Sequence, residues 1–194
     1  MPWLMRLRKL LVLSSAITLL AACMTQPQLI TGVSNARSAD TLHRWQARGR
    51  IGINAAQQSG SGGFTWAQQA ALSEVQLRGP VGIGAFSLSL DGSVLTIRGS
   101  DGAYYDADAA LDELQLRLGT PLPVASLRYW LLGLAAPGEP RWLDDQHNQL
   151  EQDGWQVTYE VWTTRGELRL PVRLALTRAD ARIRIVVQSW NLES

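Results

Sequence analysis

The sequence predicts a mostly β (α+β) protein of one domain, with a curved antiparallel sheet and helices against the concave side of that sheet. Many segments alternate apolar and polar residues with a period of two, which is typical of strands with one buried face. Between residues 106 and 133 the apolar spacing changes to steps of three and four, which is typical of helices. The 194 residues contain no internal repeat and are enough for one sizeable core.

The N-terminus has the organisation of an export signal. Basic residues are followed by an apolar run from Leu10 to Leu20, which is too short to span a membrane as a helix. The sequence Leu20-Ala21-Ala22-Cys23 matches the lipobox of bacterial lipoproteins, in which the signal is cut before the cysteine and the thiol receives diacylglycerol. The alternative is an ordinary signal peptide that ends by chance at a cysteine.

Cys23 is the only cysteine, so no disulfide can form within the chain. Lipidation explains a lone thiol in an oxidising compartment, and two or three acyl chains hold a protein on a membrane. By the sorting rule of enterobacteria, Met24 in place of an aspartate favours the outer membrane. We therefore predict a lipoprotein signal peptide over residues 1–22, a lipidated N-terminus and tether over 23–40, and a folded domain over 41–194.

The first half of the domain reads as strands. A short helix is expected over 36–43, and the polar, Gly/Ser-rich residues 57–63 are expected to form a loop. In the first strand Trp45, Ile51 and Ile53 share one face, and arginines occupy the other. The strands expected from alternation cover 45–53, 64–67, 72–78, 85–90 and 94–98.

A turn with unusual side chains separates two of these strands. Residues 79–84 read Gly-Pro-Val-Gly-Ile-Gly, which is turn chemistry because glycine permits positive φ and Pro80 fixes φ. Turns lie at the surface, yet Val81 and Ile83 are aliphatic. These side chains either face an apolar partner or fold back onto the core.

Two helices interrupt the strands. Asp106 or Asp108 can cap the first helix, whose apolar positions are Leu111, Leu114 and Leu118 and which ends at Gly119. A second helix is expected over 123–132 and closes at Gly133. Strands return over 155–161, 172–176 and 183–190.

The sequence offers little for catalysis, a metal or a cofactor. Eighteen basic residues against seventeen acidic ones give no indication of nucleic-acid binding. His43 and His147 lack metal-ligand spacing, and no nucleophile elbow or phosphate-binding fingerprint is present. Asp144 and Asp145 are interpreted as a solvated turn, since neighbouring side chains on an extended segment point in opposite directions. We expect a protein that is not an enzyme.

The tryptophans are the remaining side chains that could form a binding site. Seven of the eight tryptophans follow the export signal. They either fill a core or line a cleft, as apolar side chains do in small-molecule pockets, and composition does not choose between these.

The order and spacing of several segments resemble the LolB family of outer-membrane lipoprotein receptors over nearly the whole mature chain. These segments are Cys23, Trp45 with Gly49-Arg50-Ile51, Phe64-Thr65-Trp66, Gly79-Pro80-Val81-Gly82, Leu122-Pro123-Val124, Leu127-Arg128-Tyr129-Trp130-Leu131-Leu132-Gly133, Asp153-Gly154-Trp155-Gln156-Val157-Thr158-Tyr159, Leu170-Pro171 and Trp190.

The resemblance implies an open antiparallel β half-barrel with helices as a lid over a hydrophobic cavity. It also implies a lipid-anchored receptor on the periplasmic side of the outer membrane, with the periplasmic carrier LolA, acylated lipoproteins and outer-membrane lipid as partners. The loop of Pro80, Val81, Gly82 and Ile83 matches the family's membrane-insertion loop, in which many members carry leucine where this chain has Val81. The side chains expected to line the acyl-chain cavity are Trp66, Leu77, Phe86, Leu88, Leu127, Trp130, Leu131, Trp155 and Tyr159.

This function agrees with the energetics of acyl chains. Exposing a long acyl chain to water costs on the order of 10 kcal/mol, at about 0.8 kcal/mol per methylene. Each carrier therefore needs an apolar cavity, and transfer without ATP must run downhill into the bilayer. The competing hypotheses are a lipid-anchored structural or envelope-assembly lipoprotein with a filled core, and an anchored hydrolase, for which no site is present. We expect a monomer.

Overall fold

The computed structural model describes residues 42–56, 58–79 and 85–193. The predicted signal peptide, the lipidated Cys23, the tether and the loop residues Pro80, Val81, Gly82 and Ile83 lie outside the described residues, as does most of the helix expected over 36–43. In the part of the chain that is described, no helix combines the length and apolar character needed to cross a bilayer.

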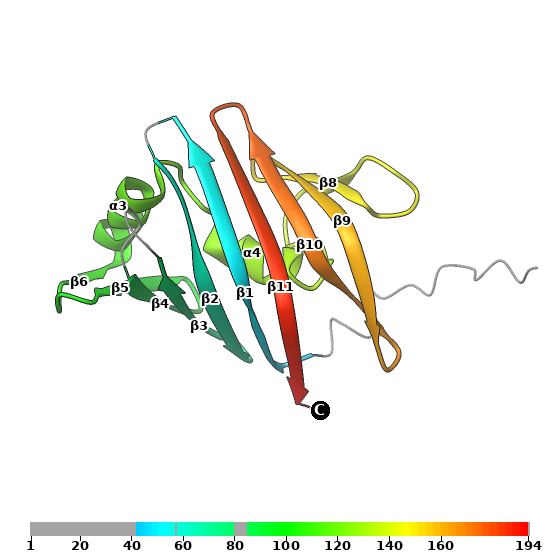
Figure 1. Cartoon of the computed structure of the whole chain (residues 1–194), viewed down its shortest axis with the longest axis horizontal. Coiled ribbons are helices and arrows are strands. Elements are labelled where there is room, and N and C mark those ends of the chain that lie inside the picture. Colours follow the sequence, from blue (N-terminus) through cyan, green and yellow to red (C-terminus); the bar gives the residue numbers. More distant parts are fainter. Residues whose placement is uncertain (1–41, 57, 80–84, 194) are drawn as a thin grey trace, which may run out of the picture. The chain divides into compact units, whose positions relative to one another are not determined.

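One antiparallel sheet of eleven strands dominates the described part of the domain (Figure 1). The strand order is β6-β5-β4-β3-β2-β1-β11-β10-β9-β8-β7, so β6 and β7 are the two edges and the sheet is open. The strands are β1 (Arg44–Ala55), β2 (Ser59–Gln69), β3 (Leu72–Arg78), β4 (Ala85–Asp91), β5 (Val94–Gly99), β6 (Tyr104–Asp106), β7 (Arg141–Trp142), β8 (Gln149–Gln152), β9 (Trp155–Arg165), β10 (Leu168–Arg178) and β11 (Ala181–Glu193). The mostly β, open antiparallel architecture expected from the sequence is confirmed.

The central strand β1 shows why alternation predicted this sheet. Trp45, Ala47 and Ile51 are buried on the inner face, while Arg48 and Arg50 are exposed on the outer face. β1 pairs with β2 on one side and with β11 on the other. Because β1 pairs with β11, the N-terminal strands and the C-terminal strands form one continuous sheet.

The prediction of a loop over 57–63 is wrong for most of this range, because β2 begins at Ser59. Gly62 allows two backbones to pack closely, because a Cβ there would lie 2.6 Å from the carbonyl oxygen of Arg78. The same composition that indicates a flexible loop also suits a strand that another backbone approaches closely.

Two helices occupy the space between β6 and β7 in the sequence. They are α3 (Ala107–Leu118), followed by Gly119 with a left-handed φ of 71°, and α4 (Val124–Trp130). Asp106 occupies the N-cap position of α3, but its side chain makes no capping hydrogen bond.

The apolar face predicted for α3 is correct at Leu114 and Leu118 and wrong at Leu111. Leu111 is 53% exposed, and Ala110 is buried in its place. Residues 110, 114 and 118 are four residues apart and therefore share one face of the helix. Leu111 lies one position beyond this face and is exposed.

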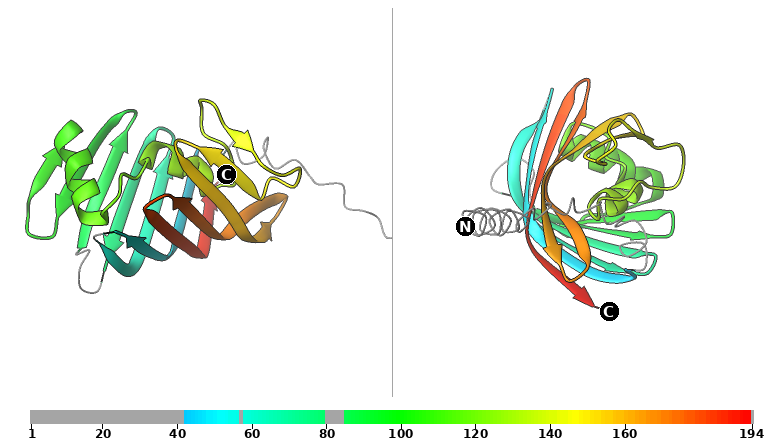
Figure 2. Two further views of the ribbon diagram at one scale, coloured as in Figure 1. Left: turned by 90° about the horizontal axis from the view of Figure 1, so that it is seen from above. Right: turned by 90° about the vertical axis from the view of Figure 1, so that its right-hand side faces the viewer.

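The sheet curves around the two helices, as the end-on view in Figure 2 shows. α3 packs on β5 and β6, near one edge of the sheet. The buried side chains of α4 join those of the inner sheet face in a single core. The helices therefore lie on the concave side, as the sequence predicted.

Candidate functional site

A wholly apolar cavity of about 30 Å³ lies between α4 and the inner face of the sheet. The sheet contributes residues from β1, β2, β3, β4 and β11, α4 contributes Val124 and Leu127, and Leu131, the residue that caps the C-terminus of α4, also lines the cavity. Steps of three and four place these three side chains on one helix face. On the strands, Val75 and Leu77 reach the same cavity because alternate residues share a face.

Five of the nine predicted cavity residues line this space, and four do not. Trp66, Leu77, Leu88, Leu127 and Leu131 are brought together. The side chains that line it without having been singled out are Ile51, Phe64, Val75, Leu122, Val124 and Ile185. Strand alternation and the helical spacing from Leu127 were the signals that could have found most of them.

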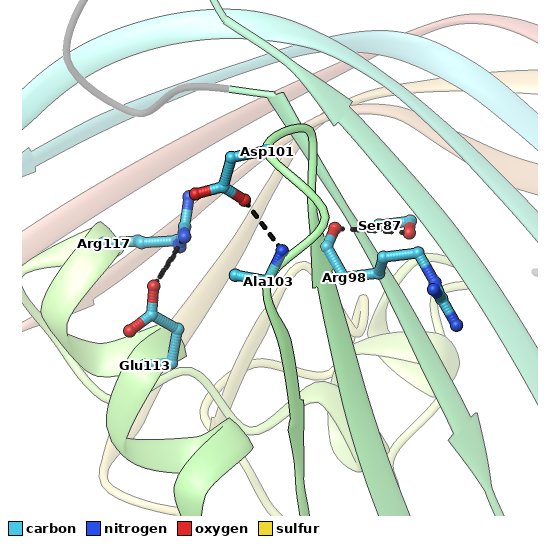
Figure 3. A network of polar contacts seen from close by, with 6 residues as sticks. All are labelled: Ser87, Arg98, Asp101, Ala103, Glu113 and Arg117. Atoms are coloured by element: carbon cyan, nitrogen blue, oxygen red, sulfur yellow. Dashed lines mark hydrogen bonds and ion pairs between the residues drawn. The ribbon is translucent and has the colours of Figure 1, made fainter.

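Phe86 is one of the four that lie elsewhere. It is 4% exposed, and the Arg117 guanidinium of α3 lies 5.3 Å from the centre of its ring. Arg117 is itself held 2.6 Å from Glu113, one helical turn earlier, in the polar cluster shown in Figure 3. In the same cluster the carboxylate of Asp101 accepts the backbone N–H of Ala103 and shapes the turn before β6. Phe86 is therefore a core residue under α3.

Trp130, Trp155 and Tyr159 are also buried outside this cavity. Trp130 is a fully buried hydrogen-bond donor, and Trp155 lies under the guanidinium of Arg178, whose centre is 5.5 Å from the ring. Tyr159 packs against Trp162, with 4.9 Å between ring centres. Burial raises the pKa of Tyr159 well above its usual range, so its hydroxyl stays neutral.

The side of α4 that faces β8 and β9 is fastened by hydrogen bonds. The Oε1 of Gln152 accepts both the indole N–H of Trp130 and the backbone N–H of Ala136, each at 3.0 Å. The Nε2 of Gln152 donates to the carbonyl of Ala136 at 2.8 Å. Ser126 donates to the carboxylate of Asp153, in the turn between β8 and β9. The last residue of β8 and the turn that follows it therefore hold α4 by directional contacts.

A second, mixed pocket of about 280 Å³ lies beside the first. Arg128 and Tyr129 of α4 line it, together with the start of β1 and the turn between β2 and β3. The wall between the pockets includes Trp45 and Trp66, whose rings stack with centres 6.0 Å apart. We call this space the polar pocket.

Asp144 and His147, two of the other titratable side chains considered in the sequence, make contacts that account for them structurally. The Oδ1 of Asp144 accepts the backbone N–H groups of Asn148 and Gln149, as expected of a turn. His147 packs edge-on against Trp142. Over the described residues, no cluster of three or more potential metal ligands is found.

The comparisons with known proteins agree with this geometry. The family model of the outer membrane lipoprotein LolB matches residues 43–190. The chain belongs to the LolB family. It is 34% identical over 200 residues to the outer-membrane lipoprotein LolB of Pseudomonas paraeruginosa, covering 96% of this chain and 97% of that protein. It is also 34% identical to LolB of Alkalilimnicola ehrlichii, with 97% and 99% covered.

Solved structures show the same fold at low identity. A LolA-superfamily protein from Nitrosomonas europaea aligns with a TM-score of 0.52 at 10% identity, over 83% of this chain and 93% of that one. Family membership makes the chain an outer-membrane lipoprotein that inserts lipoproteins into the outer membrane, a receptor and not an enzyme.

Proposed function

We propose that this member of the LolB family receives acylated lipoproteins from the carrier LolA, holds their acyl chains between the sheet and α4, and releases them into the outer membrane. The observation that supports this most is the wholly apolar lining of the cavity beneath α4. A buried space without polar groups suits a hydrocarbon chain, which gains about 0.8 kcal/mol for each methylene removed from water.

The cavity must widen to hold cargo. Its volume of about 30 Å³ has room for about two water molecules. Pockets that bury a drug-sized ligand usually measure about 300–1,000 Å³. Acyl chains therefore enter by parting α4 from the sheet, and the leucines of α4 exchange their contacts with the sheet for contacts with cargo.

The hydrogen bonds of α4 indicate the side on which it opens. Gln152 and Asp153 hold α4 to the end of β8 and the turn before β9. Towards β1–β4, Val124, Leu127 and Leu131 make only apolar contacts around the cavity, and no hydrogen bond joins a described side chain of α4 to these strands. Apolar contacts with the sheet can be replaced by apolar contacts with an acyl chain at little cost, whereas hydrogen bonds cannot.

Two predicted features complete the proposal. Residues 1–22 serve as the signal peptide, Cys23 carries the lipid anchor, and residues 23–40 tether the domain 41–194 to the membrane. The loop with Pro80, Val81, Gly82 and Ile83 follows β3, whose Leu77 lines the cavity, and contacts the bilayer when cargo leaves.

A two-step transfer experiment tests this function. LolA loaded with a radiolabelled lipoprotein is mixed with the mature chain carrying Cys23→Ser, without ATP, and liposomes are added afterwards. Label should move first to this protein and then to the liposomes. If the folded protein takes no label from LolA of the same organism, the receptor function is wrong and a structural lipoprotein with a filled core takes its place.

A further inference from the structure

Arg128, beside the apolar cavity, has one buried N–H group without a hydrogen-bond partner among the described residues. The Nε of Arg128 is inaccessible to water and has no acceptor among the described residues. Buried donors are nearly always paired, since leaving one unpaired costs the full loss of its hydration. An orphaned guanidinium N–H inside a pocket wall therefore points to a ligand that supplies the acceptor.

The rest of Arg128 is held in place. Its Nη2 donates to the hydroxyl of Tyr129 at 2.9 Å, and its guanidinium carbon lies 4.7 Å from the centre of the Tyr129 ring. A guanidinium fixed on an aromatic ring keeps a planar fork of donors with little freedom left to lose on binding. Arg128 is thus preorganised to donate.

One buried polar side chain of the same pocket shows the contrast. Gln68, which also lines the polar pocket, accepts from Trp66 and Ser73 and donates to the carbonyl of Ala70. It has no need of a ligand. The described lining of the polar pocket contains no carboxylate that could neutralise Arg128.

The position of Arg128 relative to the apolar cavity suggests what the ligand is. Leu127 and Leu131 point into the apolar cavity, whereas Arg128 and Leu132, one position later in each case, line the polar pocket. An acyl chain lying along the leucines would bring its carbonyl end to the next strip of α4. That carbonyl loses its hydrating water on entry and is costly to bury without a donor.

We propose that Arg128 donates hydrogen bonds to the carbonyl oxygens that join the acyl chains to the lipid-modified cysteine of the cargo. This inference rests on the proposed function. The polar pocket would then hold the acceptor-rich head of the lipid, while the apolar cavity, once widened, holds the chains. Arg128 would distinguish an acylated peptide from a plain hydrocarbon.

A matched pair of lipopeptides tests this assignment. One carries two palmitoyl chains through ester bonds on S-glyceryl-cysteine, and the other carries two hexadecyl chains of the same length through ether bonds, which lack carbonyl oxygens. Binding to the mature chain with Cys23→Ser is measured by displacement of an apolar fluorescent dye. The protein with Arg128 unchanged should bind the ester peptide about ten-fold more tightly than the ether peptide, as one hydrogen bond from a charged donor implies.

Arg128→Met should remove this preference, weakening ester binding about ten-fold and changing ether binding less than about two-fold. Arg128→Lys keeps the charge and loses the planar fork of donors, so its preference for the ester peptide should lie between those of the wild-type protein and Arg128→Met. Arg182→Met is the control, since Arg182 is exposed on β11. Urea unfolding of each variant shows whether it is folded.

The outcomes separate the two proposals. If the wild-type protein binds both peptides equally, or if Arg128→Met weakens both alike, the assignment of Arg128 is wrong while lipopeptide binding stands. If the wild-type protein binds neither peptide, the cavity does not accept acyl chains, and both proposals are wrong. The wild-type ester-to-ether ratio decides the question even where Arg128→Met does not fold.

Discussion

The two sides of α4 contact the sheet by different kinds of interaction. Towards β8 and β9, Trp130 and Ser126 donate to Gln152 and Asp153, so the contact has defined direction and geometry. Towards β1–β4, Leu127 and Leu131 meet a wholly apolar face around a small cavity. The first side specifies where α4 sits, and the second can exchange one apolar neighbour for another. A receptor that must bind and release hydrocarbon needs both in one helix.

The largest expected effect lies on the hydrogen-bonded side. Gln152→Met keeps the side-chain length but leaves the indole N–H of Trp130 and both backbone groups of Ala136 unpaired. At roughly 1–3 kcal/mol for each buried orphan, we expect a loss of about 4 kcal/mol in the free energy of unfolding in urea. Gln156→Met, at an exposed position of β9, should change it by less than about 0.5 kcal/mol. A loss below about 1 kcal/mol in Gln152→Met would mean that Gln152 does not fasten α4.

The apolar side should trade stability for binding. Leu127→Ala removes a side chain that is 4% exposed and should cost about 3 kcal/mol in urea unfolding. The enlarged cavity should also bind an apolar fluorescent dye more tightly than the wild-type protein does. Leu116→Ala, at a side chain that is 70% exposed, should change neither quantity. Weaker dye binding by Leu127→Ala would show that the cavity beneath α4 is not the binding space.

A smaller effect is expected at the turn between β8 and β9. Ser126→Ala removes the hydrogen bond to Asp153 and should cost about 1.5 kcal/mol, since the acceptor is charged. Asp153→Asn keeps an acceptor, and asparagine tolerates the positive φ of 53° found there, so it should cost less than about 0.5 kcal/mol. Equal losses in the two variants would contradict a role for this hydrogen bond. Thermal or urea unfolding measures both.

The smallest effect on stability is expected at Val81, in the predicted membrane-insertion loop. Val81→Glu should leave the free energy of unfolding within about 0.5 kcal/mol of the wild-type value, because a loop side chain that faces lipid contributes little to the core. It should nevertheless slow the release of labelled lipoprotein into liposomes, since a carboxylate is costly to bring into a bilayer. Loss of folding in this variant would show that Val81 belongs to the core.

Local patterns were enough to predict the sheet and much of the helical pair. Alternation located β1, β3 and β9, and Gly119 marked the end of α3. The loop prediction was wrong over Ser59 to Gly63, where Gly62 allows a close approach of two backbones within a strand. That approach depends on the pairing of β2 with the end of β3, which the composition of residues 59–63 alone does not contain.

The division between cavity and core could not be predicted from the sequence. Phe86 and Leu88 share one face of β4, yet Phe86 lies beneath Arg117 and Leu88 lines the cavity. Only the position of the two helices separates them. Arg128 gave no local signal either, because an arginine beside apolar residues in a short helix usually faces water. Its orphaned donor is visible only once α4 is packed against the sheet.

The most direct test of an α4 that opens on one side is a pair of distance measurements by electron spin resonance in the chain with Cys23→Ser. One spin-label pair joins exposed Ala125 on α4 to exposed Gln76 on β3, and the other joins Ala125 to exposed Gln156 on β9. Adding the ester lipopeptide should lengthen the first distance by several ångströms and leave the second unchanged. If the lipopeptide binds and both distances stay the same, or if both lengthen together, α4 does not open in the way proposed.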